Sequence, residues 1–229
     1  NFYENHREST FKTRFEIVQE TTNNLVNSLS SVNVGLMAFN FEEGGNVLQA
    51  VEEVSVTRTD FVTKLNTLAP STWTPLSEIL FESMRYFKGD TRKFGDSSKT
   101  DSAALTGSNP YKSPIVSSCQ KNNVVLLTDG EPTRDDNNES TIESYIGLGA
   151  GGCSGNCLEE VAGAMFSQDL SPLEGDQNAT IYTVAFAADF PFMKDTAEAG
   201  GGKYFQADNT DELETALRDI VQSILSQDT

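Results

Sequence analysis

Hydrophobic and polar positions alternate along the chain with two different periods. Apolar side chains recur at steps of three and four over residues 11–29, which predicts an amphipathic helix. Residues 32–39 form a short, β-rich apolar run, typical of a strand covered on both faces. Residues 47–56 alternate more strictly and carry Glu52 and Glu53, so we expect an edge strand after the Gly44–Gly45 turn.

The same criteria predict further elements downstream. Thr74 stands at an N-cap position and Pro75 at the first helical position of a helix that runs to about residue 87. Asn209 and Glu212 form a capping pair for the last helix. The other expected helices span residues 60–68, 158–168 (with Val161, Met165 and Phe166 buried) and 191–199, and the other expected strands span 123–128, 180–186 and 203–207.

Helices that alternate with short apolar strands predict an α/β fold. We expect a Rossmann-like, doubly wound, mostly parallel central sheet flanked by helices, in one domain over residues 1–229. Polar segments at about 89–118 and 130–156 are expected to be inserted surface loops. Because the chain opens on a helix, we expect that the first central strand is missing and that the domain is N-terminally incomplete.

Composition narrows the function classes. The chain has 16 Lys plus Arg against 34 Asp plus Glu, a net charge of -18, which disfavours nucleic acid and anionic lipid as partners. No apolar run approaches the roughly 18 residues of a membrane-spanning helix, so we expect no membrane insertion. The single histidine, His6, lies in a polar stretch and is expected to be solvated. This disfavours catalytic mechanisms that need a histidine and zinc sites that need several histidine ligands.

Two oxygen-bearing side chains are candidates for a metal site. Asp129 ends the strand at 123–128, and Thr74 precedes a helix, so both are expected at the carboxyl edge of the sheet, where ligands collect. A carboxylate and a hydroxyl are hard ligands that suit Mg²⁺. The simpler interpretation is that Thr74 only caps its helix and that Asp129 with Gly130 only forms a turn. Residues 135–139 resemble the start of a calcium loop but lack its glycine and closing glutamate, so we expect a solvated acidic loop there.

The position of the expected strand at 123–128 decides which of the three cysteines can form a disulfide. Cys119 precedes the strand at 123–128, whereas Cys153 and Cys157 follow it, and six residues of strand separate the two ends by about 20 Å. That distance is far too long for a disulfide, so we expect Cys153 to pair with Cys157. Three free thiols or a two-cysteine metal site are the alternatives. Cys119 is expected to be free or bonded to a segment upstream.

Longer motifs point to a family. The segments VNVGLMAFN, TWTPLSEIL and NNVVLLTDGEPT resemble the von Willebrand factor type A fold in order and spacing. YKSPI, CQKNNVVLLTDGEPT, CSGNCLEEVAGAMF, YTVAF and AGGGKYFQADNTDELETAL resemble the PilY/PilC family of type IV pilus tip proteins. This resemblance covers nearly the whole chain.

The resemblance implies a metal-ion-dependent adhesion site that keeps one coordination position open for a partner's carboxylate. The family's threonine ligand corresponds to Thr74 and its later aspartate to Asp129, with Mg²⁺, or Ca²⁺ or Mn²⁺, as the cofactor. The family's Asp-x-Ser-x-Ser motif is not found before Phe11, so the site is incomplete here. Either the first strand and its motif lie upstream of residue 1, or the metal site has been lost; the unpaired backbone that a lost central strand would leave favours the first.

The implied function is a non-enzymatic adhesion module at the pilus tip, outside the cell. It would act in pilus biogenesis, surface attachment and surface sensing. Its expected partners are minor pilins, the rest of the pilus tip protein, and a host or abiotic surface ligand. The alternative is a structural, force-bearing scaffold that contacts minor pilins without binding a metal. A metallohydrolase would need a base and a second ligand cluster, and the sequence offers neither.

Overall fold

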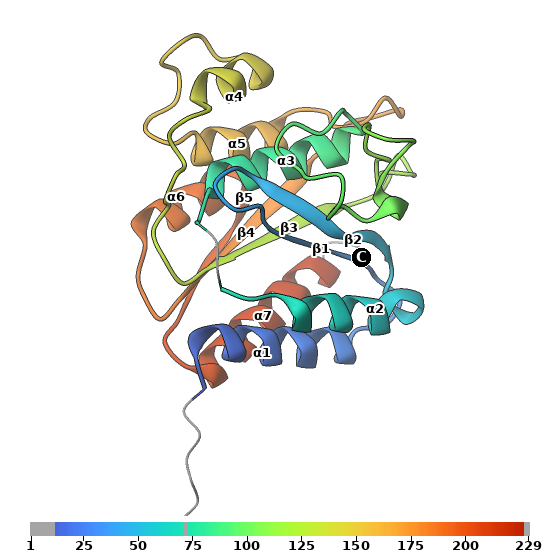
Figure 1. The fold of residues 1–229 in the computed structure, drawn as a ribbon, viewed down its shortest axis with the longest axis vertical. Coiled ribbons are helices and arrows are strands. Elements are labelled where there is room, and N and C mark those ends of the chain that lie inside the picture. Colours follow the sequence, from blue (N-terminus) through green and yellow to red (C-terminus); the bar gives the residue numbers. More distant parts are fainter. Residues whose placement is uncertain (1–11, 71–72, 227–229) are drawn as a thin grey trace, which may run out of the picture.

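Helices and strands alternate along the chain (Figure 1), which a computed structural model describes for residues 12–70 and 73–226. The strands are β1 (Asn33–Phe39), β2 (Gly45–Glu53), β3 (Asn122–Thr128), β4 (Ala179–Phe186) and β5 (Gly201–Ala207). The helices are α1 (Arg14–Ser28), α2 (Val54–Thr67), α3 (Leu76–Lys88), α4 (Glu139–Ile146), α5 (Leu158–Ser167), α6 (Pro191–Ala199) and α7 (Thr210–Leu225), with a 3₁₀ turn, η1, at Ser102–Ala104.

The strands form two sheets rather than one. β3, β4 and β5 are parallel and lie in that order, and β1 pairs with β2 in antiparallel fashion. Within the described residues no pairing joins β1 to β3. The predicted α/β fold with a mostly parallel sheet flanked by helices is therefore confirmed, with an interruption between its two parts.

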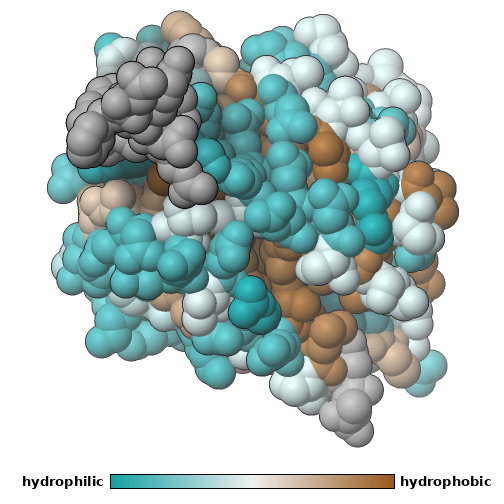
Figure 2. Space-filling view, turned by 90° about the horizontal axis from the view of Figure 1, so that it is seen from below, coloured by the Kyte–Doolittle hydropathy of each residue, from teal (hydrophilic) through white to brown (hydrophobic). Residues whose placement is uncertain are grey.

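Helices cover the strands from both sides (Figure 1). α3 and α5 pack on one face, and α1, α2 and α7 lie on the other. The core is densest around β4, whose residues from Ile181 to Phe186 are at most 1% exposed. Figure 2 views the side that α1, α2 and α7 form, where most of the surface is hydrophilic.

Capping residues set the ends of several helices. Thr13 is the N-cap of α1 and forms a reciprocal capping box with Glu16, so the helix begins later than residue 11. Asn209 accepts a hydrogen bond from the Glu212 amide at the start of α7, as predicted. Gly89 ends α3 in the left-handed region at φ 70°, which a side chain would disfavour. His6 and Phe11 lie outside the described residues.

Two boundary predictions and one burial prediction were wrong. β2 ends at Glu53 and α2 begins at Val54, well before residue 60, so residues 54–56 are helical. The β-branched side chains of Val54 and Val56 favour a strand locally, but Val54 is buried under α1 and its amide donates a hydrogen bond to the Val32 carbonyl. Phe166 is 41% exposed rather than buried, and its ring lies against Gly201 at the start of β5.

The segments expected to be surface loops are packed more closely than their composition indicates. Residues 89–118 are held to α3 by buried Glu82, which accepts hydrogen bonds from the Lys93 and Phe94 amides and the Tyr111 hydroxyl. The 130–156 segment contains α4, which the sequence pattern did not predict. Both segments are thus folded parts of the domain.

Candidate functional site

Three loops meet at the carboxyl ends of β1 and β3. The Trp73 amide donates to the Phe41 carbonyl at 3.2 Å. The Thr74 amide donates to the Thr133 hydroxyl at 2.8 Å, and the Thr133 amide returns a bond to the Thr74 carbonyl at 3.1 Å. We call residues 40–44, 73–75 and 129–135 the carboxyl rim. The rim brings the loop that carries Thr74 together with the loop that carries Asp129.

Thr74 does not have the capping role that its position predicts. Pro75 is the N-cap of α3, and no side-chain cap bond is made there. Within the described residues the Thr74 hydroxyl makes no hydrogen bond, and the residue is only half-buried. The hydroxyl therefore has no structural partner in this part of the chain.

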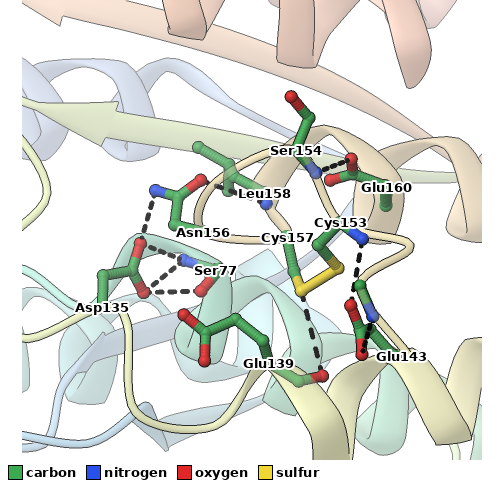
Figure 3. Close-up of a disulfide and its surroundings, with 11 residues drawn as sticks. Ser77, Asp135, Glu139, Glu143, Cys153, Ser154, Asn156, Cys157, Leu158 and Glu160 are labelled. Atoms are coloured by element: carbon green, nitrogen blue, oxygen red, sulfur yellow. Dashed lines mark hydrogen bonds between the residues drawn. A yellow bond between two sulfur atoms is a disulfide. The ribbon is translucent and has the colours of Figure 1, made fainter.

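Asp135 performs the capping of α3 from 58 residues away. Its carboxylate accepts hydrogen bonds from the Ser77 amide at 2.9 and 3.1 Å and from the Ser77 hydroxyl at 2.6 Å (Figure 3). A carboxylate at this place satisfies free amides of the first turn and interacts well with the helix dipole.

The expectation of a solvated acidic loop was wrong for Asp135, which is 5% exposed. Burial raises the pKa of Asp135 to about 7, against the hydrogen bonds from Ser77, which lower it. Burial also raises the pKa of Glu78, whose carboxylate accepts bonds from the Asn138 amide at 2.6 Å and the Gly44 backbone at 2.8 Å. These two buried acids tie the loops of the rim to the start of α3.

Asp129 follows β3 directly and is exposed. The turn after β3 is held by the Thr128 hydroxyl, which bonds both the carbonyl and the amide of Gly130. The Asp129 carbonyl accepts a long bond of 3.5 Å from Arg14 at the start of α1. Among the described residues, no hydrogen bond to the Asp129 carboxylate is observed, so the turn does not depend on it.

The disulfide between Cys153 and Cys157 is confirmed, with a Cα–Cα distance of 4.8 Å. It closes the loop that carries Asn156, whose side-chain amide donates to Asp135 at 2.8 Å (Figure 3). Glu143 on α4 accepts from the Cys153 amide at 3.0 Å on the other side of the loop. The disulfide loop thereby helps to hold the residue that caps α3. Cys119 is exposed and free.

Aromatic side chains stand exposed on the rim. Phe41 is 57% exposed and Trp73 is 41% exposed, and the Arg134 guanidinium lies 5.0 Å from the centre of the Trp73 ring. Phe41 and Arg134 have φ values of 53° and 59°, a region that residues other than glycine rarely adopt and that often marks functional loops. The sequence analysis missed this group, although large aromatic residues in polar loops were a usable signal.

The rim carries the two side chains that the sequence analysis assigned to a cation. The Thr74 hydroxyl and the Asp129 carboxylate are hard oxygen donors of the kind that Mg²⁺ prefers, so their chemistry fits. Two donors are fewer than the roughly six of an octahedral shell. In the described part of the chain no group of three or more His, Cys, Asp or Glu residues could hold a metal. The remaining oxygens would have to come from water or from other polypeptide.

Parallel strands, helices on both faces and a polar rim at the carboxyl ends define an α/β domain of the von Willebrand factor A-like class. A family model described as the second domain of PilY1 homologs matches residues 3–179. The chain belongs to this family.

Solved structures resemble this chain at low sequence identity. A mutant of the PilB minor pilin from Streptococcus sanguinis aligns with 95% of this chain and 56% of its own, at 12% identity and a TM-score of 0.50. Proximal thread matrix protein 1 from the mussel byssus, with a zinc-occupied MIDAS motif, aligns with 90% of this chain and 42% of its own at 13% identity and a TM-score of 0.49.

An aerotolerance-related membrane protein from Bacteroides fragilis, with multiple mutations to serine, aligns with 92% of this chain and 89% of its own at 12% identity and a TM-score of 0.49. No curated protein matches the chain by sequence.

Proposed function

We propose that this domain is a non-enzymatic binding module of a type IV pilus tip protein. It acts in surface attachment, in pilus biogenesis and in surface sensing. One observation carries the proposal: the loops of Thr74 and Asp129 are joined by two hydrogen bonds between Thr74 and Thr133, with both candidate ligand side chains unpartnered among the described residues. Family membership supports the pilus assignment.

In this proposal, the carboxyl rim binds its partner through a divalent cation. Thr74 and Asp129 supply two oxygens to Mg²⁺, or to Ca²⁺ or Mn²⁺, and water and polypeptide outside residues 1–229 supply more. One position is left for a carboxylate of the partner. The protein's own contribution is rigidity, because the buried acids Asp135 and Glu78 fix the loops before any ligand arrives.

The exposed side chains beside these oxygens provide contact area for the partner. Phe41, Trp73 and Arg134 are of types that are enriched at protein interfaces, and together they offer exposed apolar area beside a guanidinium cation. We assign this surface to minor pilins, to the rest of the pilus tip protein, or to a host or abiotic surface ligand.

An extracellular location at the pilus tip agrees with the chemistry of the chain. The Cys153–Cys157 disulfide suits an oxidising compartment, such as the periplasm through which a pilus protein is secreted. In the described residues, no helix has the length and apolar character needed to cross a membrane.

The second candidate is a force-bearing scaffold that contacts minor pilins without a metal. This candidate is favoured because, in the described ranges, no group of three or more His, Cys, Asp or Glu residues could hold a metal ion. Surface attachment that persists undiminished in a chelator would support this candidate over the metal-dependent one.

The test is Mg²⁺ binding by the full-length protein and its Asp129→Ala variant, measured by isothermal titration calorimetry. We expect the variant to lose at least about tenfold in Mg²⁺ affinity, because a carboxylate ligand is removed from a small ligand set. Asp136→Ala is the matched control, since Asp136 is an exposed acid in the same loop. Unchanged affinity in Asp129→Ala would contradict the assignment of the site.

A further inference from the structure

The positive charge of the chain is concentrated in one stretch. Residues 82–118 hold six Lys or Arg against four Asp or Glu, a net charge of +2, so the other residues together carry -20. This stretch comprises the second half of α3 and the loop that follows it, which lies beside the end of that helix (Figure 1). We call residues 82–118 the basic segment. Its cations are Arg85, Lys88, Arg92, Lys93, Lys99 and Lys112.

The four acids of the basic segment are engaged within the domain. Each accepts hydrogen bonds from backbone amides, from hydroxyl groups or from Lys64. In the described part of the chain, none of the six cations forms an ion pair with a carboxylate. The cations are therefore not paired with the acids next to them in sequence. The acceptors and their donors are Glu82 (Lys93 and Phe94 amides, Tyr111 hydroxyl), Asp90 (Tyr145 hydroxyl), Asp96 (Ser98 amide and hydroxyl) and Asp101 (Lys64, Ala50 and Ala103 amides).

Two guanidinium groups of the basic segment are held in place by neutral partners. Arg85 donates to the Thr91 carbonyl at 2.7 Å and to the Thr91 hydroxyl at 3.0 Å. Arg92 donates to the Ser108 carbonyl at 2.7 Å and to the Asn109 side-chain oxygen at 3.2 Å. Because these acceptors carry no charge, both groups keep their full positive charge. Their fixed positions also reduce the entropy that a bound partner would cost.

Shared contacts place four of these cations close to one another. The guanidinium carbon of Arg85 and the ammonium nitrogen of Lys88 lie 4.8 and 5.2 Å from the centre of the Tyr145 ring. Arg85 also bonds the residue just before Arg92, and Lys93 is the next residue along the chain. All four cations are at least partly exposed. They form one positively charged surface at the end of α3.

One charged donor on this surface is unsatisfied. Arg92 Nη1 is buried and makes no hydrogen bond in the described structure. A charged donor without an acceptor is costly, so this arrangement of the loop is favoured by an added anion. Carboxylates suit such a place, because their two oxygens match the planar fork of a guanidinium group.

We propose that the basic segment binds an acidic polypeptide segment of a partner, whose carboxylates pair with the four cations at the end of α3. The other residues, which carry -20, repel such a partner, so they restrict it to this surface and define its orientation. A polypeptide is favoured over an acidic polysaccharide, because the Tyr145 ring, on which a sugar could stack, is already in contact with Arg85 and Lys88. This contact needs no metal ion, so it goes beyond the function proposed for the carboxyl rim.

Binding of labelled poly-L-glutamate to the full-length protein tests the proposal, by fluorescence anisotropy in EDTA. The chelator removes any cation from the carboxyl rim, so the result does not depend on the metal site. We expect Lys88→Glu/Lys93→Glu to lose at least about tenfold in affinity, since two attractive charges become repulsive. Lys203→Glu/Arg218→Glu is the matched control, because it changes the net charge equally at two exposed cations outside the segment. We expect the control to stay within about threefold of the parent.

A milder variant guards against loss of the fold. Lys88→Gln/Lys93→Gln removes the two charges without reversing them, so we expect a loss of at least about threefold with an unchanged circular dichroism spectrum. Affinity equal to that of the parent in both the Glu and the Gln variants would overturn the proposal. An equal loss in Lys88→Glu/Lys93→Glu and in the matched control would also overturn it, since net charge and not the basic segment would then decide binding.

Salt and other binding partners give the remaining outcomes. A rise in NaCl from about 0.05 M to about 0.3 M should weaken the binding of poly-L-glutamate at least about tenfold, because exposed charge pairs are screened. No binding at about 0.05 M NaCl would overturn the proposal. Tighter binding of alginate, a polysaccharide with carboxylates, would assign the surface to a polysaccharide and overturn the polypeptide partner. Self-association that Lys88→Glu/Lys93→Glu abolishes, measured by sedimentation, would assign the surface to a second copy and overturn it as well.

Discussion

At the scale of single residues, buried carboxylates replace the local interactions that the sequence predicts. Asp135 caps α3 in place of Thr74, and Glu82 and Glu143 bind backbone amides of the two long loops. Each acid accepts several hydrogen bonds, which offsets the cost of burying a charge only in part. The raised pKa of Asp135, which burial causes, reflects this balance.

A pH dependence follows from Asp135. Its pKa is about 7 in the folded protein and about 4 in an unfolded chain, so the folded state binds the proton more tightly. The stabilisation that Asp135 contributes through this difference in pKa is fully present below about pH 4 and is lost as the pH rises through about 7. We expect the unfolding free energy to fall over this window, by at most about 1.4 kcal/mol per pH unit from this residue.

Urea unfolding at several pH values measures this effect. Asp135→Asn should flatten the dependence between about pH 4 and about pH 7, since the titrating group is removed. Asp136→Asn, a change of an exposed neighbour, should leave the dependence as in the parent. If the slope of Asp135→Asn equals that of the parent, Asp135 does not carry the proton.

At the scale of elements, distant segments fix the loops of the rim. The disulfide loop presents Asn156 to Asp135, Asp135 caps α3, and the residues before α3 bond to the loop after β3. The rim is therefore arranged by packing from three parts of the chain. This arrangement explains how loops without regular secondary structure hold the segment of Thr74 against the segment that follows Asp129.

Removal of the disulfide tests the contribution of this loop. The two cysteines are separated by four positions, and for so small a loop the chain-entropy model gives about 2 kcal/mol of stabilisation. We expect the Cys153→Ser/Cys157→Ser variant to unfold at a lower urea concentration with an unchanged m value. Cys119→Ser should match the parent, because this thiol is exposed and free. Coincident unfolding curves for all three proteins would contradict the prediction.

At the scale of the whole molecule, charge and the interrupted sheet are the dominant features. A net charge of -18 on 229 residues opposes the compact state by self-repulsion. The interruption between β1 and β3 lowers the apolar area that the domain buries under α1. Both features make stability depend on what surrounds the domain.

Salt should therefore stabilise the protein at neutral pH. An increase in NaCl from about 0.01 M to about 0.1 M shortens the screening length from about 30 Å to about 10 Å. We expect the melting temperature at pH 7 to rise by about 2–4 °C, which corresponds to roughly 1 kcal/mol. The same salt series near the isoelectric point of about 4.3 should have little effect, since the net charge is then close to zero. An equal rise at both pH values would point to a cause other than self-repulsion.

Much of the fold could be predicted from the chain itself. The strands around 33–39, 122–128 and 179–186 and the helices α5, α6 and α7 lie where their apolar periods place them, because each pattern reflects burial on a sheet or helix face. Errors occur where tertiary contacts override local preference: α2 begins at Val54 although Val54 and Val56 favour a strand, and α4 forms in a segment without a clear period.

For the candidate site too, some features follow from the sequence and others only from the tertiary structure. Sequence alone determined the strand that ends before Asp129, the loop that carries Thr74, and the nearness of Cys153 to Cys157, since all three depend on neighbours along the chain. Only the tertiary structure decided that Asp135 caps α3, that Thr74 bonds to Thr133, and that Phe41 and Trp73 share a surface. Those contacts join residues about 30 to 60 positions apart, and no short-range pattern encodes them.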